Sequence, residues 1–144
     1  MKLLEIRSTV QWEWDTSDKD IILAMFSIGD LHYHVAFQSA HMPEYEGPTQ
    51  DWDVEFAVQD ESGDFTQELT GTGSSPTVFA AIIQIVREFI QNYNPRSLGF
   101  SAIEPERFKL YSRLLGMLEK AGWDVDEHES GGDRIYTAHR PDWR

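Results

Sequence analysis

The apolar residues of this chain repeat with two different periods, and the change between them constrains the fold more than any other feature. In the first half, Trp52, Val54, Phe56 and Val58 alternate with charged, polar or small residues, which is typical of a strand with one buried face. Between residues 78 and 90, apolar residues instead recur at helical spacing. Strands followed by helices predict an α+β fold, here a mostly antiparallel sheet with two helices.

The first half predicts an antiparallel meander of four or five strands. Apolar runs at 21–28 and 31–37 are separated by Gly29-Asp30, which favours a tight hairpin turn because glycine tolerates a positive φ. We expect the other strands at 10–14, 52–58 and 65–70, with a charged turn at 15–20 and a surface loop at 41–50.

The second half predicts helices joined by short strands. Ser75-Pro76 favours a helix start, because the serine side chain accepts a free backbone N–H and proline loses no bond at the first helical position. Asn94-Pro95 should end this helix, and Gly122 should end a second helix that opens at Glu104-Pro105. We expect a buried strand at 97–103 and a last hairpin around 130–133.

Charge excludes two classes of partner. The 25 acidic and 12 basic side chains give a formal net charge of −13, which repels nucleic acid phosphates and anionic membrane surfaces. The 144 residues suit one domain, 1–144, and the chain has neither a cysteine nor an apolar run long enough for a membrane helix. We therefore expect a cytoplasmic protein with no nucleic acid or membrane partner, and the sequence predicts no oligomeric state.

Two histidines are candidates for a metal site. His32 and His34 lie two positions apart in a predicted strand and share one face, a spacing that can give zinc two nitrogen ligands, with His41 or a loop carboxylate as a third. Polar residues on a solvent-facing strand explain the same pattern, so we expect no metal. The sequence also lacks a Gly-x-Ser-x-Gly elbow and the Walker and dinucleotide fingerprints.

The order of antiparallel strands, helix, strand, helix and strand pair resembles the GNAT superfamily of acetyltransferases. The resemblance covers 51–144, most clearly from about Trp52 to His139, whereas 1–50 holds divergent strands and a loop. The loop GTG, the helix VFAAIIQIVREFI and the run FSAIEPERFKLYSRL are similar to those of uncharacterised bacteriophage proteins described as GNAT-like. The resemblance implies a phage protein of the host cytoplasm that transfers an acetyl group from acetyl-CoA to an amine of a protein or small molecule.

The resemblance also implies that the loop before the first helix holds the pyrophosphate of acetyl-CoA. Backbone N–H groups at a helix start attract an anion, and glycine lets the backbone approach it closely. Family members usually have Gln or Arg three residues before the first glycine, where this chain has Glu68. An ordinary strand-to-helix connection is the alternative interpretation. The cofactor-binding residues implied are Gly71, Thr72, Gly73, Ser74 and Ser75.

A catalytic role for Tyr111 is the third implication, because family members carry a Leu-Tyr pair on the last helix and Leu110-Tyr111 matches it. There the phenol protonates the departing thiolate of CoA, a nearly balanced transfer because its pKa of about 10 is close to that of an alkyl thiol. The helix runs to Gly122, further than in the family, and begins with Glu104 where the family often has Asn. Burial on an amphipathic helix is the alternative interpretation of Tyr111.

One family feature is missing: the two helices that wall the acceptor site have no counterpart in 15–20. This departure and the net charge lead to a second hypothesis, a catalytically degenerate GNAT-like phage protein that binds a basic host or phage protein through its acidic surface. The acidic residues cluster in turns and on outer strand faces, among them Asp124, Asp126 and Glu129. If the protein is an enzyme, we expect an acidic loop residue as its base. The sequence does not decide between the two.

Overall fold

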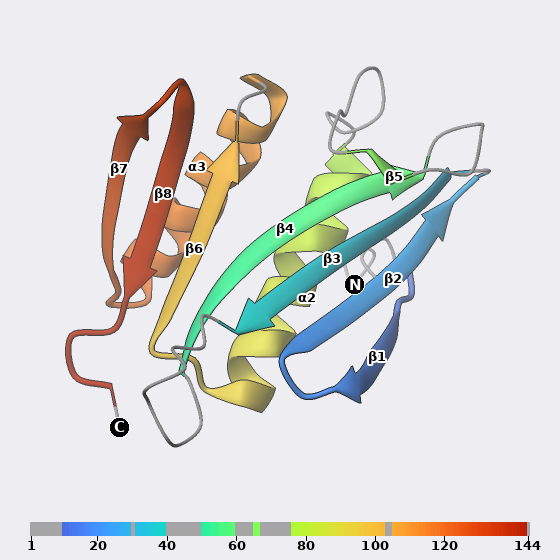
Figure 1. The fold of residues 1–144 in the computed structure, drawn as a ribbon, viewed down its shortest axis with the longest axis horizontal. Helices are drawn as coiled ribbons and strands as arrows, with labels where there is room; N and C mark the ends of the chain where they lie inside the picture. Colours follow the sequence, from blue (N-terminus) through green and yellow to red (C-terminus); the bar gives the residue numbers. More distant parts are fainter. Residues whose placement is uncertain are drawn as a thin grey trace, which may run out of the picture.

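The computed structural model describes residues 10–29, 31–39, 50–59, 65–66, 76–102 and 105–143, and Figure 1 shows their arrangement. The strands within these ranges are β1 (Glu13–Asp18), β2 (Ile21–Ile28), β3 (Leu31–Ser39), β4 (Asp51–Gln59), β5 (Phe65–Thr66), β6 (Ser97–Ala102), β7 (Asp124–Ser130) and β8 (Asp133–His139). The helices are α2 (Pro76–Tyr93) and α3 (Pro105–Lys120).

The strands form one sheet in the order β1-β2-β3-β4-β6-β8-β7, with β5 paired to the end of β4. Neighbouring strands are antiparallel except for β4 and β6, which run parallel because α2 returns the chain along the sheet between them. The predicted α+β fold, a mostly antiparallel sheet with two helices, is confirmed for the described residues.

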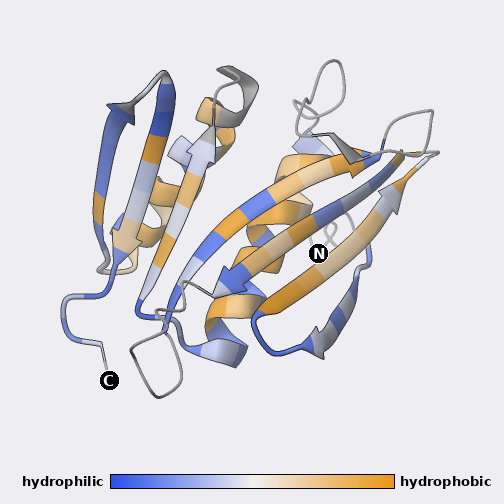
Figure 2. Cartoon of the chain, viewed as in Figure 1, coloured by the Kyte–Doolittle hydropathy of each residue, from blue (hydrophilic) through white to orange (hydrophobic). Residues whose placement is uncertain are grey.

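Both helices cover the same face of the sheet and lie behind the strands in Figure 1. The ring of Phe89 on α2 stacks on Phe37 of β3 with 3.9 Å between centroids, and Tyr111 of α3 meets the edge of Phe56 on β4. Strand residues alternate between apolar and polar, as Figure 2 shows, because only one face is buried. We call the other face, which no described helix covers, the open face; it carries the odd-numbered residues of β4 and the residues paired with them.

The helix ends follow the predicted local signals. Gly122 adopts a φ of +98° after α3, and its N–H bonds to Glu119 O at 3.0 Å, while the N–H of Trp123 bonds to Leu118 O at 3.0 Å. This pair of bonds is a Schellman motif, which satisfies the last carbonyls of the helix. α2 ends before Asn94, whose φ is +48°.

Glycines also make the predicted hairpin turns. Gly29 joins β2 to β3 with a φ of +60°, and Gly131 and Gly132 join β7 to β8 with φ values of +61° and +91°. Positive φ at both central positions of the last turn matches the right-handed twist of the strands beside it. Both hairpins are therefore confirmed.

The charged turn predicted at 15–20 is too long. β1 begins at Glu13 and continues to Asp18, so the turn is only Lys19-Asp20. Asp15 Oδ1 accepts hydrogen bonds from the N–H of Ser17 at 3.0 Å and from its hydroxyl at 2.7 Å, and the strand pairing shifts register there. A short side chain that bonds to nearby backbone lets the strand continue through polar residues.

Several expectations fall outside the described residues. The return strand is described only at Phe65–Thr66, and 67–70 and most of the loop at 41–50 are not described. No helix in the described ranges is both long and apolar enough to cross a membrane. The single domain stays a prediction.

Candidate functional site

The parallel strands β4 and β6 separate along their length. They pair only at 51–54 of β4 and 97–100 of β6. β4 then follows β3, whereas β6 follows β8, and β5 joins β4 only from Val58 onwards. No described strand pairs with β4 on that side between Val54 and Val58. The sheet therefore opens at this point, and we call the gap the strand opening.

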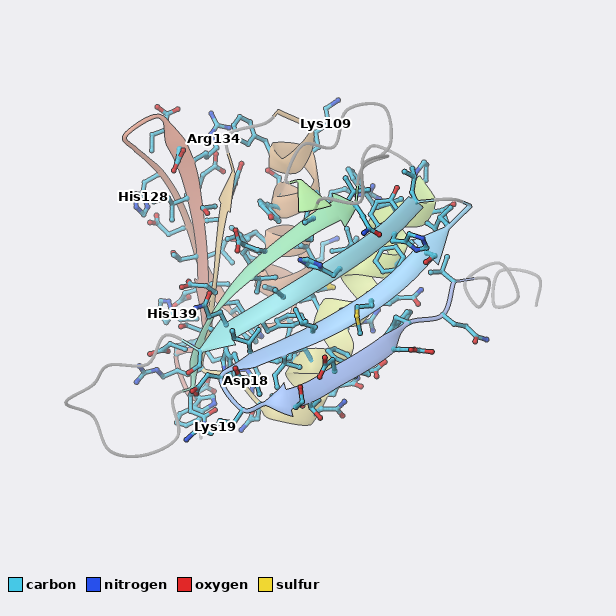
Figure 3. The ribbon with its side chains drawn as sticks, turned by 45° about the vertical axis from the view of Figure 1, so that its right-hand side comes forward. Asp18, Lys19, Lys109, His128, Arg134 and His139 are labelled. Atoms are coloured by element: carbon cyan, nitrogen blue, oxygen red, sulfur yellow. The ribbon has the colours of Figure 1, made fainter. Side chains whose placement is uncertain are left out.

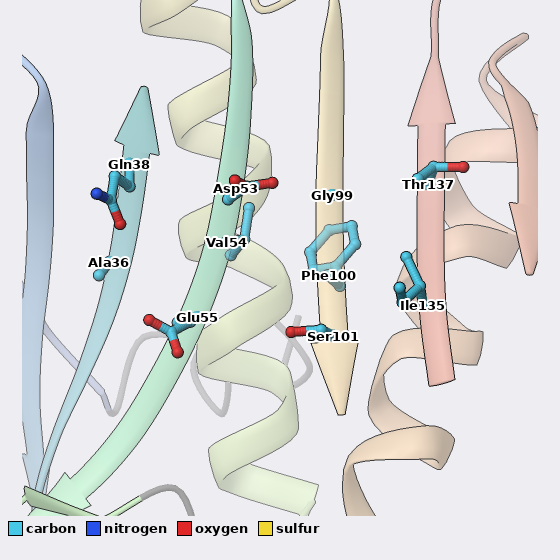
Figure 4. A pocket seen from close by; sticks show the side chains of 10 residues that line it. All are labelled: Ala36, Gln38, Asp53, Val54, Glu55, Gly99, Phe100, Ser101, Ile135 and Thr137. Atoms are coloured by element: carbon cyan, nitrogen blue, oxygen red, sulfur yellow. The ribbon is translucent and has the colours of Figure 1, made fainter. Parts of the chain in front are cut away.

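A groove of about 360 Å³ lies over the strand opening on the open face. Val54 and Phe100, the last residues at which the two strands pair, also contribute to its lining, although both are buried residues of the helix-covered face. Figure 4 shows the residues that line it, which come from β3, β4, β6 and β8: Ala36, Gln38, Asp53, Val54, Glu55, Gly99, Phe100, Ser101, Ile135 and Thr137.

Two carboxylates occupy the middle of this groove. Figure 4 shows Asp53 turned toward β6 and Glu55 turned toward β3. Asp53 lies over Gly99, where an added Cβ would stand 2.9 Å from Asp53 Oδ1, so a larger residue would push the carboxylate away. Partial burial and, next, the charge of Glu55 raise the pKa of Asp53. A carboxylate with a raised pKa accepts a proton more readily at neutral pH.

A histidine stands beside the carboxylates. His34 projects from β3 to the open face and is partly buried. Burial lowers the pKa of His34, and the negative charge of Glu55 opposes this shift. An imidazole with a lowered pKa is neutral at pH 7 and can accept a proton. The open-face side of the strand opening is thus lined by groups that can take a proton from a ligand.

Tyr111 lies on the other side of the sheet, among the strands that flank the strand opening. Its ring centroid is 5.1 Å from that of Phe100 on β6, 6.1 Å from that of Phe56 on β4 and 5.7 Å from that of Tyr136 on β8. Only 1% of the residue is exposed. The structure therefore packs Tyr111 in the core at this gap, and its catalytic role stays a prediction.

A second hollow, of about 510 Å³, lies on the helix side of the molecule. Phe79 belongs to the first turn of α2, so the hollow adjoins the start of that helix. Figure 3 shows Lys109 and Arg134 at the same end of the molecule, and Arg134 lies 4.6 Å from the ring centroid of Phe108. Cations beside aromatic rings suit a ligand with phosphates and a planar base. The hollow is lined by Phe79, Phe108, Lys109, Ser112 and Arg113.

The predicted pyrophosphate loop is not described. Glu68, Gly71, Thr72, Gly73, Ser74 and Ser75 all lie outside the described residues, so their roles stay predictions. His32 and His34 share the open face as predicted, whereas His41 is outside the described ranges. Within the described ranges, no group of three or more His, Asp or Glu residues is arranged to hold a metal ion.

Sequence reasoning missed the carboxylates of the groove as site residues. It assigns the base to an acidic loop and takes the charged residues that alternate with Trp52, Val54 and Phe56 only as the polar face of a strand. The signal that could have found them is Gly99 inside a predicted strand, because a strand glycine often marks the close approach of another group.

Comparisons with known proteins give fold similarity only. No family model matches this chain, and no curated protein matches it. A solved structure whose name proposes phosphinothricin N-acetyltransferase activity has a TM-score of 0.48 and 18% identity, over 87% of this chain and 75% of the other. The ribosomal-protein-S5-alanine acetyltransferase of Vibrio fischeri has a TM-score of 0.48 and 11% identity, over 99% and 69%. AAC(6')-Ib with ribostamycin and coenzyme A has a TM-score of 0.42 and 11% identity, over 85% and 65%.

Proposed function

We propose that this protein transfers an acetyl group from acetyl-CoA to an amine. The observation that carries the proposal is the strand opening, which has Asp53 turned toward it on the open face and Tyr111 packed on its helix side. Proton acceptors and a proton donor on opposite sides of one gap suit a reaction in which an amine loses a proton and a thiolate gains one.

The residues of the gap account for every proton in this reaction. Acetyl-CoA supplies the acetyl group as a thioester. Asp53, or Glu55 beside it, takes the proton that the amine releases as its nitrogen forms the new C–N bond. Tyr111 donates the phenolic proton to the sulfur as the C–S bond breaks, and solvent then restores both groups. The raised pKa of Asp53 favours the first of these transfers.

The hollow on the helix side fits the anionic end of acetyl-CoA. In a chain with a net charge of −13, Lys109 and Arg113 gather positive charge beside the first turn of α2. Phe79 and Phe108 offer aromatic surface for the adenine ring. We propose that these residues act with the loop from Gly71 to Ser75, which directly precedes α2 in the sequence.

Tyr111→Phe tests the proposed acid. Because it removes one hydroxyl and keeps the ring, turnover should fall about 10²- to 10⁴-fold while KM for acetyl-CoA changes little. The measurement is release of free CoA thiol with a panel of amines, at a temperature well below unfolding. The matched control is Tyr93→Phe, because Tyr93 stacks on Phe89 of α2 at 4.7 Å and is not at the strand opening. Equal turnover of the Tyr111 variant and the native protein would contradict the role of Tyr111.

A catalytically degenerate protein that binds a basic host or phage protein remains the alternative prediction. Titration with acetyl-CoA separates the two, because the enzyme should bind it at micromolar concentration and the degenerate scaffold should not. A phage source and a cytoplasmic location stay predictions as well.

A further inference from the structure

The open face has carboxylates but no lysine or arginine at any described strand position. The basic residues of the described ranges lie in turns, on helices or on the helix side of the sheet. Arg134 lies over the ring of Phe108 and Arg140 over that of Trp123. Arg96 lies just before β6, at the rim of the open face, and donates a hydrogen bond to Asp51 at 3.0 Å. The described strands therefore bring no lysine or arginine to the open face, whereas acidic residues lie on both faces of the sheet.

Strand register aligns four of the carboxylates across the sheet. Two rows of paired residues each have a carboxylate at both ends and uncharged residues between. The first row, from β1 to β4, is Asp15, Leu23, Ala36 and Glu55. The second row, from β4 to β7, is Asp53, Gly99, Thr137 and Asp126. Each row crosses three strand spacings of about 4.8 Å, so its ends lie about 14 Å apart.

Apolar surface flanks the first row, and a groove lies where the two rows meet. Ile21 and Met25 of β2 are 37% and 38% exposed on the open face. The groove of about 360 Å³ contains Glu55 and Asp53, where the two rows meet. Lysine and arginine side chains match such a surface, because their methylene stems cover apolar groups while their charged ends reach carboxylates.

We propose that the open face binds an extended polypeptide whose lysine or arginine residues recur at about every fourth position. An extended chain rises about 3.3–3.4 Å per residue, so side chains four residues apart share one side and lie about 13–14 Å from each other. This spacing equals that of the carboxylates along each row. The polypeptide crosses the strands from Asp15 to Asp126, and its central basic residue enters the groove at Asp53 and Glu55.

Charge favours this occupant over a second copy of the chain, because two open faces would bring like charges together. The docking itself needs no acetyl transfer. That the central lysine is the acetyl acceptor rests on the proposed function, and it makes the acceptor a protein amine.

Fluorescence anisotropy tests the docking without acetyl-CoA, at about pH 8, where histidine is uncharged. The probe is a labelled peptide of Gly and Ser with three lysines at every fourth position. The comparison ligands are a peptide of the same composition with contiguous lysines and spermine as a competitor. We expect the spaced peptide to bind most tightly. Its binding should weaken as salt rises, because the Debye length falls from about 10 Å at 0.1 M to about 3 Å at 1 M.

Charge-neutral variants locate the binding surface. The triple variant Asp15→Asn, Asp53→Asn and Asp126→Asn should bind the spaced peptide about ten- to one-hundred-fold more weakly than the native protein. If the triple variant fails to fold, the double variant Asp15→Asn with Asp126→Asn replaces it. The matched control changes net charge equally on the helix side, with Glu119→Gln, Glu127→Gln and Glu129→Gln. The affinity of the control variant for the spaced peptide should fall no more than about two-fold, since its altered charges are on the other side of the sheet and act on the peptide only at long range.

Several outcomes would overturn the proposal: no binding, equal loss in both variants, or contiguous lysines or spermine binding as tightly as the spaced peptide. The result is separable from the proposed function. Peptide binding by a protein that does not bind acetyl-CoA would keep the docking and refute the transfer. Acetylation of small amines by a protein that does not bind the peptide would keep the acetyl transfer and refute the docking.

Discussion

The position of the Asp53 side chain depends on a glycine at the paired position of the next strand. On β6 the paired position is Gly99, so the carboxylate extends over the neighbouring strand and into the groove. Partial burial and the charge of Glu55 then both disfavour its ionised form. The features that suit Asp53 as a base also make its charge unfavourable in the folded state.

Asp53→Asn should therefore stabilise the fold at neutral pH, by up to about 0.5 kcal/mol. A pKa raised above the ordinary value of 3.8 means that the folded state holds this proton more tightly than the unfolded state. The penalty from Asp53 is present above the raised pKa and disappears as pH falls below about 3.8. Thermal unfolding of both proteins at several pH values measures this. A stabilisation that persists at low pH would assign the effect to something other than charge.

At the scale of elements, local signals were sufficient for most boundaries. Pro76, Asn94-Pro95 and Gly122 act within one helical turn, so they could be interpreted without knowing the fold. The Asp15 side chain also acts locally, but its bond to Ser17 supports a strand where charged residues usually indicate a turn.

The strand opening could not be predicted in the same way. It depends on the register of β4 with β6, two strands separated in sequence by α2. Periodicity tells which residues share a face, but not where a neighbouring strand stops pairing. The same limit explains Glu129: unlike Asp124 and Asp126, it pairs with Arg134 on the helix side, so the three carboxylates do not form one surface.

Two glycines, one inside α3 and one just after its end, should respond oppositely to the same substitution. Gly122→Ala should destabilise the protein by about 1 kcal/mol, because the Schellman cap needs a φ of +98° that alanine disfavours. Gly116→Ala, inside α3 and with no atom within 4 Å of the added Cβ, should stabilise it by about 0.5–1 kcal/mol. Urea unfolding measures both values. A similar change in the two variants would show that the cap geometry is not what holds Gly122.

At the scale of the whole molecule, the sheet separates two electrostatic environments. The helix side has basic residues paired with acidic ones, such as Arg134 with Glu127 at 3.2 Å and Glu129 at 3.5 Å. The open face has carboxylates without a lysine or arginine at the described strand positions. Neutralising Asp53, whose charge is disfavoured, should therefore have the opposite effect to neutralising Glu127 or Glu129, which pair with Arg134.

Two double variants should shift the melting temperature in opposite directions at low ionic strength and about pH 8. Asp53→Asn with Asp126→Asn removes repulsion and should raise the melting temperature, whereas Glu127→Gln with Glu129→Gln removes attraction to Arg134 and should lower it. The free energy of unfolding should change by no more than about 1 kcal/mol in each variant, because exposed charges contribute little to stability. Both should shrink at 1 M salt, where the Debye length is about 3 Å. Shifts of the same sign would mean that net charge, rather than its division between the two faces, governs the stability of this protein.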